Sequence, residues 1–124
     1  MSQRILIVED HPTMREALRL VLEREDLEIV EASDGTAALA SARSAPPDVV
    51  LLDLHIPGTP GEDVLAALKS DPATAGVRVI VVTATGEEGR ARAMEAGADA
   101  YFTKPFSPTA LLQAVEQARG DSAS

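Results

Sequence analysis

Polar residues with three kinds of functional group stand at or just beyond the ends of four short apolar runs of this sequence. They are the acids Glu9, Asp10 and Asp53, the hydroxyl residue Thr83 and the amine Lys104. Gathered in one place, three carboxylates repel each other, and at least one takes up a proton unless a cation joins them. Carboxylate ligands without cysteine or histidine suit a hard cation, and a site with few protein ligands and open positions suits Mg²⁺.

A magnesium ion beside a carboxylate and a lysine is a setting for phosphoryl transfer. The metal and the ammonium group of Lys104 would neutralise charge on the phosphoryl oxygens, and Thr83 could donate a hydrogen bond to one of them. Asp53 could act as the nucleophile and form an acyl phosphate. Neither GxGxxG nor GxxxxGK[ST] occurs, so the phosphoryl group would arrive on a donor rather than in a nucleotide-binding loop.

Five short apolar runs predict the strands that must position these residues. Each run is mostly β-branched and is bounded by polar or turn residues. The runs span residues 5–8, 27–32, 49–52, 77–84 and 100–103. The second run is polar at alternate positions, which predicts a strand at the edge of the sheet.

Helical patterns follow each of these runs. Their signals, in order, are His11-Pro12 before an apolar stripe from Met14 to Leu22, Asp34 as a cap with Pro46-Pro47 beyond, the apolar set Val64, Leu65 and Leu68, a segment from about Glu87 to Ala96 before Gly97, and Ser107-Pro108. Arg90 and Arg92 are expected on a solvated face of the fourth helix. Gly86 and Gly89 lie at the start of this helix, and each interior glycine weakens a helix by about 0.5–1 kcal/mol. We therefore expect the fourth helix to be easily shifted.

The alternation of strands and helices predicts an α/β fold of the (βα)5 type, a doubly wound parallel sheet with helices on both faces. The pattern alone does not give the strand order. Ligands of such sheets bind beyond the carboxyl ends of the strands, so the polar residues above should meet at one edge and line an acidic cleft. We expect one domain, residues 1–120, and a flexible tail, residues 121–124.

Composition excludes several classes of partner. The chain has 124 residues and a formal net charge of −9, which argues against direct contact with nucleic acid because phosphate backbones attract lysine and arginine. It has no cysteine, so disulfides and thiolate metal sites are excluded. The apolar run 5–8 is too short for a signal peptide, and no window is long enough to span a membrane. We expect a cytoplasmic protein that does not bind membranes.

With these motifs in place, the sequence resembles a response-regulator receiver domain of two-component signalling, in the CheY-like superfamily. The resemblance extends from about Arg4 to Arg119 and rests on "ILIVED", "DVVLLDLHIPG", "VIVVTA" and "GADAYFTKPF", in this order and spacing. It implies the strand order 2-1-3-4-5. It also implies a phosphoprotein that works as a signalling switch, catalysing only its own phosphorylation and autodephosphorylation.

The resemblance assigns the chemical roles residue by residue. Asp53 would accept the phosphoryl group from a sensor histidine kinase or a histidine phosphotransfer protein. Asp10 and Asp53 would bind Mg²⁺, Glu9 would bind it through water, and the backbone carbonyl of His55 would complete the ligands. Lys104 would contact the acid or its phosphoryl oxygens, and the sequence permits either isomer of the bond to Pro105.

The resemblance also implies a switch. Thr83 would move toward the phosphoryl group, and Tyr101 would turn inward behind it. The surface of the fourth helix, fifth strand and fifth helix would then change its affinity for a downstream effector protein or domain, or for a second copy of the chain.

Plainer interpretations stay open for single residues. Asp53 could cap a neighbouring loop, Lys104 could be a solvated lysine, and Tyr101 could only fill the core. For His55 we favour a role for the carbonyl alone. The alternative is that its side chain, with Thr85, gates water and tunes the lifetime of the phosphoryl group.

Three rival functions also stay open. A haloacid-dehalogenase enzyme would carry a second aspartate two positions after Asp53, where this chain has His55. A flavodoxin-like carrier would need a hydroxyl-rich loop in place of Glu9-Asp10. A receiver used only for binding, without phosphorylation, is disfavoured because the acids, Thr83 and lysine are all present. The sequence does not say whether the chain stands alone or belongs to a larger regulator or hybrid kinase.

Overall fold

A computed structural model of the chain describes residues 3–23 and 27–120; the tail predicted to be flexible, 121–124, lies outside them. Within this part the strands are β1 (Gln3–Val8), β2 (Leu27–Ala32), β3 (Val49–Leu52), β4 (Arg78–Thr83) and β5 (Ala100–Thr103). All neighbouring strands pair in parallel, in the order β2-β1-β3-β4-β5. The (βα)5 sheet and the order implied by the resemblance are confirmed.

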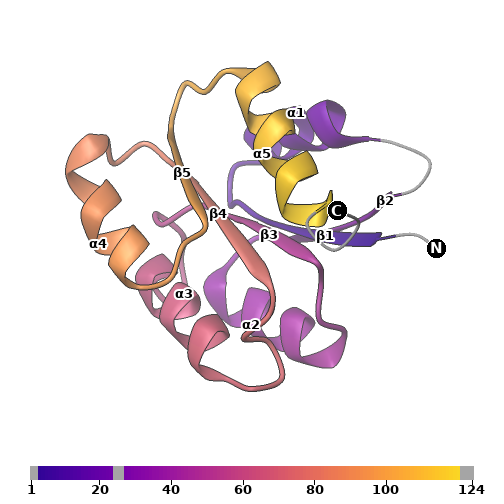
Figure 1. Cartoon of the computed structure of the whole chain (residues 1–124), viewed down its shortest axis with the longest axis vertical. Helices are drawn as coiled ribbons and strands as arrows, with labels where there is room; N and C mark the ends of the chain where they lie inside the picture. The colour runs from indigo at the N-terminus through magenta and orange to yellow at the C-terminus, as the bar shows by residue number, and fades with distance from the viewer. Residues whose placement is uncertain (1–2, 24–26, 121–124) are drawn as a thin grey trace.

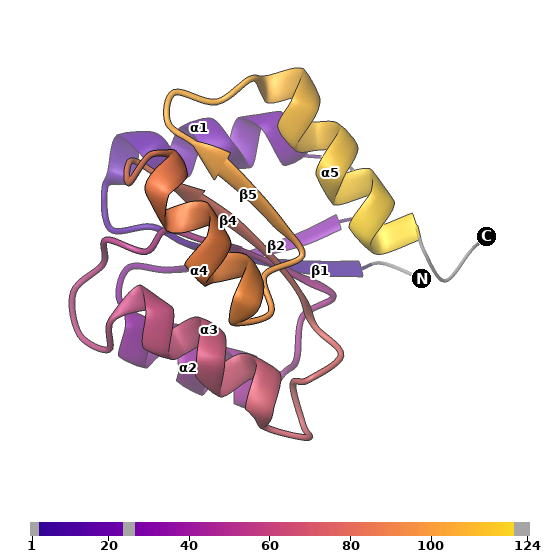
Figure 2. The ribbon, with the colours of Figure 1, turned by 60° about the vertical axis from the view of Figure 1, so that its left-hand side comes forward.

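The helices cover both faces of this sheet (Figure 1, Figure 2). They are α1 (Pro12–Leu22), α2 (Gly35–Ser44), α3 (Gly61–Ser70), α4 (Arg90–Glu95) and α5 (Pro108–Gly120). One apolar cluster lies between the sheet and α1 and α5, and the other lies under α2, α3 and α4. None of the helices within residues 3–23 and 27–120 is both long and apolar enough to cross a membrane.

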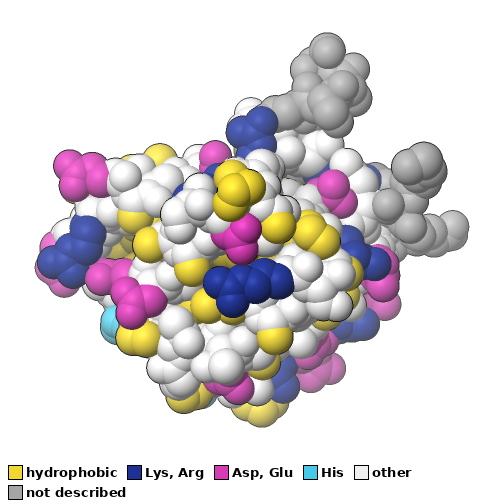
Figure 3. Space-filling model, turned by 90° about the horizontal axis from the view of Figure 1, so that it is seen from below, with side chains coloured by type: hydrophobic (Ala, Val, Ile, Leu, Met, Phe, Trp, Pro, Cys, Tyr) yellow, Lys and Arg dark blue, Asp and Glu magenta, His cyan; other side chains and the backbone are white. Residues whose placement is uncertain are grey.

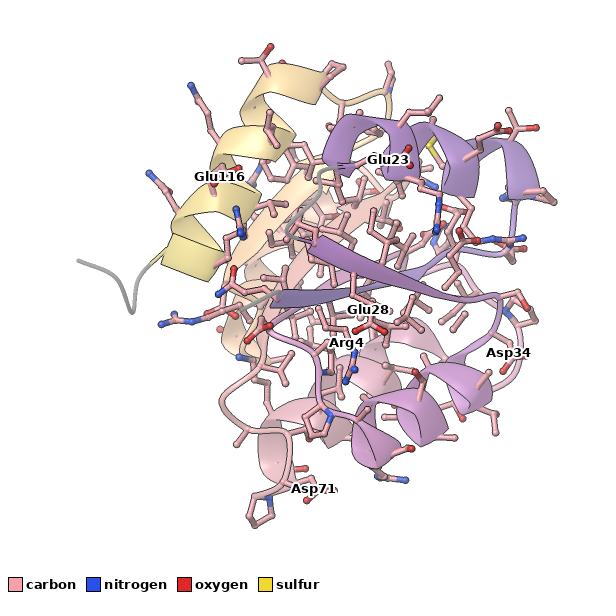
Figure 4. All side chains as sticks on the ribbon, turned by 90° about the vertical axis from the view of Figure 1, so that its right-hand side faces the viewer. Arg4, Glu23, Glu28, Asp34, Asp71 and Glu116 are labelled. Atoms are coloured by element: carbon pink, nitrogen blue, oxygen red, sulfur yellow. The ribbon has the colours of Figure 1, made fainter. Side chains whose placement is uncertain are left out.

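Strand β1 shows why the central strands read as continuous apolar runs. Ile5 and Ile7 face the cluster on the α1 side, whereas Leu6 and Val8 face the opposite cluster. Successive side chains of a strand point to opposite faces, so a strand covered on both sides needs apolar residues at every position. The predicted edge strand is confirmed as β2, where Glu28 is exposed and pairs with Arg4 of β1 at 3.0 Å (Figure 4).

Local signals set the ends of several helices. Pro12 occupies the first turn of α1, and the Asp34 side chain accepts a 2.7 Å hydrogen bond from the backbone N–H of Ala37 to cap α2 (Figure 4). Helix α3 begins at Gly61, where a Cβ atom would lie 2.4 Å from the backbone of Leu54. Only glycine lets the start of α3 approach the loop after β3 this closely.

The fourth helix is shorter than predicted. The segment expected to be one helix from about Glu87 to Ala96 divides into a 3-10 turn, Glu87–Gly89, and the six-residue α4. Of the α4 residues, Ala93 alone is buried, so few apolar contacts support a longer helix. Gly97, with φ of 112°, ends the segment as predicted.

Charges of both signs are spread over the molecule. Figure 3 shows acidic and basic side chains interspersed with small apolar areas on the face that lies below in Figure 1, where α2 and α3 are found. Arg43 of α2 and Asp71, just beyond α3, pair at 3.4 Å. The net charge is therefore not concentrated on this face, and the buried charges gather instead at the carboxyl edge of the sheet.

Candidate functional site

Lys104 joins two buried carboxylates at the carboxyl edge of the sheet. Its Nζ donates hydrogen bonds to Glu9 Oε1 at 2.6 Å and to Asp53 Oδ2 at 2.9 Å. Glu9 is 0% exposed and Asp53 4% exposed. Buried carboxylates persist when charged donors compensate for the lost water. The three residues come from the ends of β1, β3 and β5, so the sheet itself brings them together as predicted.

The backbone around Asp53 fixes the direction of its carboxylate. The N–H of Asp53 donates to the carbonyl of Val8 at 3.1 Å and extends the strand pairing by one residue. The N–H of His55 donates to Asp53 Oδ1 at 2.9 Å. With Lys104 on the other oxygen, both oxygens of the acid have donors, which explains how an acid can follow a fully buried strand.

The charge state of Lys104 follows from these contacts. Burial alone would lower the pKa of its ammonium group, but the hydrogen bonds to Glu9 and Asp53 outweigh burial and raise the pKa above its ordinary value. Lys104 is therefore charged at neutral pH. Its backbone N–H donates to the carbonyl of Thr83 at 2.8 Å, and the bond to Pro105 is cis, the isomer that the sequence left open.

Asp10 lies beside this cluster together with His11. Ligand atoms of Glu9, Asp10 and His11 all lie within 4.8 Å of one another. Asp10 Oδ1 is buried and has no hydrogen-bond partner among the described residues; His11 Nδ1 lies 3.2 Å away, without hydrogen-bond geometry. The sequence predicts for His11 only the start of a helix, although its position directly after two acids is a signal for this proximity.

Thr83, Thr85 and His55 form a second polar group. Thr83 is fully buried, and its Oγ1 lies 3.2 Å from Thr85 Oγ1. Thr85 Oγ1 in turn lies 2.8 Å from His55 Nε2. The imidazole of His55 therefore has Thr85 as its hydrogen-bond partner, at the same carboxyl edge of the sheet as Asp53.

Tyr101 of β5 lies inward. Its side chain is 4% exposed, and its Oη donates a 2.6 Å hydrogen bond to the carbonyl of Gly86. A surface pocket of about 570 Å³ lies at the amino edge of the sheet, between Gln3 and Arg119, and none of the predicted site residues lines it.

Comparison with known proteins identifies the family of this chain. The response regulator receiver domain family matches residues 5–116. The chain is 41% identical over 117 residues to the phosphate regulon transcriptional regulatory protein PhoB of Escherichia coli (strain K12), covering 94% of this chain and 51% of PhoB. It thus spans about half the length of the curated relatives that it matches.

Solved structures of receiver domains match nearly the full length of the chain. A response regulator receiver domain protein (CheY-like) from Methanospirillum hungatei JF-1 gives a TM-score of 0.89 at 27% identity, covering 99% of this chain and 98% of that one. The receiver domain of the sensor histidine kinase PA1611 from Pseudomonas aeruginosa PAO1, with a magnesium ion coordinated in its active site cleft, gives 0.86 at 26% identity, with coverage of 97% and 99%. Strand order, family match and structural neighbours agree, and the chain belongs to the response regulator receiver domains, the signalling switches of two-component systems.

Proposed function

We propose that this receiver accepts a phosphoryl group on Asp53, with Mg²⁺ bound beside it, from a sensor histidine kinase or a histidine phosphotransfer protein. The observation that carries the proposal is the position of Lys104, whose Nζ lies 2.6 Å from Glu9 and 2.9 Å from Asp53. A fixed positive charge next to a buried carboxylate suits a nucleophile whose product carries phosphoryl oxygens.

The transfer needs little from the protein beyond position and charge. A carboxylate oxygen of Asp53 attacks the phosphorus atom of a phosphohistidine. The new P–O bond forms as the P–N bond breaks, and the imidazole nitrogen keeps the electron pair and takes up a proton. The 2.9 Å hydrogen bond from the His55 N–H holds the carboxylate in direction, and Lys104 balances the charge of the phosphoryl oxygens.

The donor atoms at this edge suit a magnesium ion. Asp10 Oδ1 is buried without a hydrogen-bond partner in the described part of the chain, so it is an acceptor that a cation would satisfy. Asp10 and Asp53 would hold the ion, with Glu9 through water and His55 through its carbonyl. When bound, Mg²⁺ supplies positive charge that stabilises the transferring phosphoryl group. A receiver of similar structure, that of PA1611, has magnesium in its cleft.

We further propose that Thr83 leaves Thr85 and turns toward the phosphoryl group, with Tyr101 inward behind it. The α4–β5–α5 surface then changes its affinity for an effector protein or domain, or for a second copy of the chain. The switch, residues 1–120, works in the cytoplasm and does not itself contact nucleic acid or membrane. The hydrogen bond between Thr83 and Thr85, 3.2 Å long, is the contact that such a movement would break.

The contact between His55 and Thr85 supports a role for both in the lifetime of the phosphoryl group. A 2.8 Å hydrogen bond joins their side chains, and each residue stands two positions after a proposed site residue, Asp53 or Thr83. We expect His55→Ala to change the half-life of phosphorylated Asp53, timed by loss of label after the donor is removed. An unchanged half-life would leave His55 with its carbonyl role alone.

Mass spectrometry after incubation with Mg²⁺ and acetyl phosphate tests the phosphorylation site. We expect one phosphoryl group on each wild-type chain and none on Asp53→Asn. Asp63→Asn is the matched control, because Asp63 is an exposed acid in the first turn of α3. Label that persists on Asp53→Asn would refute the site, and an unlabelled wild type would favour a receiver that only binds.

Titration with Mg²⁺ tests the metal ligands separately. A ligand that binds only the folded state raises stability with its concentration, so the thermal midpoint of the wild type should rise with Mg²⁺. Asp10→Asn removes a ligand charge and should weaken this rise. A wild-type midpoint that does not respond to Mg²⁺ would contradict the metal site.

A further inference from the structure

Tyr101 is held inward by contacts from the segment that leads into α4 and from the first residue of α4, a helix that lies beside β5 (Figure 2). Its Oη donates to the carbonyl of Gly86 at 2.6 Å. The guanidinium carbon of Arg90 lies 5.0 Å from the centroid of the Tyr101 ring, within the range of cation–π attraction. Arg90 is exposed, as expected for a solvated face, and its guanidinium group also lies over the ring.

Glu87 holds the guanidinium group in place. Arg90 Nε donates to one oxygen of Glu87 at 2.6 Å, and Nη2 donates to the other at 3.0 Å. Such a bidentate pair fixes the orientation of the guanidinium plane. The hydrogen bond with Arg90 is the main reason why the pKa of Glu87 is lowered from its ordinary value. Glu87 is therefore ionised at neutral pH.

Gly89 leaves the space that the inward ring needs. A Cβ atom at this position would lie 2.8 Å from Tyr101 Oη, closer than unbonded carbon and oxygen atoms approach. The phenol is the end of a side chain that can rotate, so a methyl group here would displace the ring rather than the backbone.

We propose that Glu87 and Arg90 form a latch that positions Tyr101 inward before any phosphoryl group is present. Arg90 is the positioning residue for Tyr101, and Glu87 orients Arg90. The inward position of Tyr101 that the proposed switch requires is therefore already occupied before phosphorylation, and phosphorylation should shift the ring only slightly. Only the last step of the test below rests on the proposed function.

Tyr101 can be observed without a label, because the sequence has one tyrosine and no tryptophan. Quenching of its fluorescence by acrylamide, a neutral quencher, measures the exposure of this one ring without Mg²⁺ or a phosphodonor. Loss of an exposed cation–π contact changes the ratio of inward to outward ring by about two- to fivefold. We expect Arg90→Ala to raise quenching accordingly and Gly89→Ala to raise it further.

Two variants separate the latch from general loosening of α4. Arg92→Ala removes an arginine two residues along, whose 76% exposed side chain pairs with Glu62 instead, and it should leave quenching unchanged. Arg90→Lys retains the charge over the ring but not the bidentate pair, and it should give an intermediate value. Circular dichroism confirms that each variant is folded.

The outcomes decide the proposal. If acrylamide quenches Arg90→Ala no more than Arg92→Ala, the latch is overturned. Gly89→Ala is the positive control, because its increased quenching shows that an outward ring is detected. Gly89→Ala that stays protected also overturns it, because the inward contact would then be absent.

Acetyl phosphate with Mg²⁺ gives the last step. Quenching should change little in the wild type and fall clearly in Arg90→Ala, since phosphorylation would restore the inward ring. Equal changes in both proteins would contradict the preset position. Absence of label on Asp53, measured on the same samples by mass, would count against the proposed function and leave the quenching result without donor intact.

Discussion

Helices α3 and α4 cover the same face of the sheet but are held by different kinds of contact. Helix α3 has ten residues and buries Val64, Leu65 and Leu68. Helix α4 has six residues and buries Ala93 alone among them. The segment before α4 is fastened instead by a hydrogen bond from Tyr101 to Gly86, and the first residue of α4, Arg90, contacts the Tyr101 ring.

This difference distinguishes the rigid part of the receiver, which carries the buried charges of the site, from the part that would move in the proposed switch. Asp53 lies in the connection to α3, whose apolar anchors share the stability of the core. Thr83 is the last residue of β4, directly before the connection to α4, and the polar and partly exposed contacts of α4 are individually weak. Segments with few buried apolar contacts open at low free energy, so the proposed movement of α4 would leave the floor of the site in place.

The largest effect should come from the anchors of α3. Leu65 is 0% exposed, so Leu65→Ala should lower the free energy of unfolding by about 3 kcal/mol, through lost burial and the cavity left behind. Met94→Ala in α4 is the contrasting change, since Met94 is 42% exposed, and it should cost less than about 0.5 kcal/mol. Urea unfolding measures both. Equal costs would mean that α4 is anchored like α3.

Removal of the lysine charge should have the next largest effect. Lys104→Met leaves the buried carboxylates of Glu9 and Asp53 without their shared donor, and we expect a loss of about 2 kcal/mol at neutral pH. The folded-state pKa of Lys104 is raised, so its stabilisation is complete below the ordinary lysine pKa and is lost as the pH rises through the folded value.

The pH dependence gives the sign that checks this argument. An unshifted lysine titrates near pH 10.5, so the difference in unfolding free energy between wild type and Lys104→Met should narrow above that pH. Burial raises the pKa of Tyr101 above its ordinary value, but Tyr101 is present in both proteins, so its titration cancels to first order. A difference that widens in alkali would show that Lys104 does not stabilise the fold through its charge.

The sequence predicted those parts of the site that depend on the strands. Because parallel strands end at one edge, Glu9, Asp53 and Lys104 could be placed together from their positions after apolar runs. The strand order came from the resemblance rather than from the pattern, because periodicity carries no information on which strands are neighbours.

Contacts made by loops could not be predicted in this way. The hydrogen bond between His55 and Thr85 joins residues 30 apart in the sequence, and it depends on the paths of two connections. The 3-10 turn before α4 was missed for a related reason. Gly86 and Gly89 indicated a weak helix but not where the helix would begin. The contact of Arg90 with Tyr101 could not be predicted either, because it depends on how β5 lies beside this segment.

A smaller effect should follow from loss of the N-terminal cap of α2. This helix is capped by a side chain, whereas α4 has no side-chain cap. The Asp34 side chain accepts from the N–H of Ala37 at 2.7 Å, so Asp34→Ala should lower the free energy of unfolding by about 1 kcal/mol. Asp34→Asn retains a capping oxygen and should cost only a few tenths of that. Equal losses in thermal unfolding would assign the effect to charge rather than to the cap.

The smallest effect should belong to the ion pair that links α3 to α4. Arg92 Nη1 lies 3.2 Å from Glu62, with side chains 76% and 50% exposed. Exposed pairs are screened by water and salt and contribute roughly 0–1 kcal/mol, so a double-mutant cycle of Glu62→Gln and Arg92→Gln should give a coupling below about 0.5 kcal/mol at physiological salt. If the coupling instead exceeded about 1 kcal/mol, α4 would be tied to the well-anchored α3, and a movement of α4 would have to draw on the stability of the core.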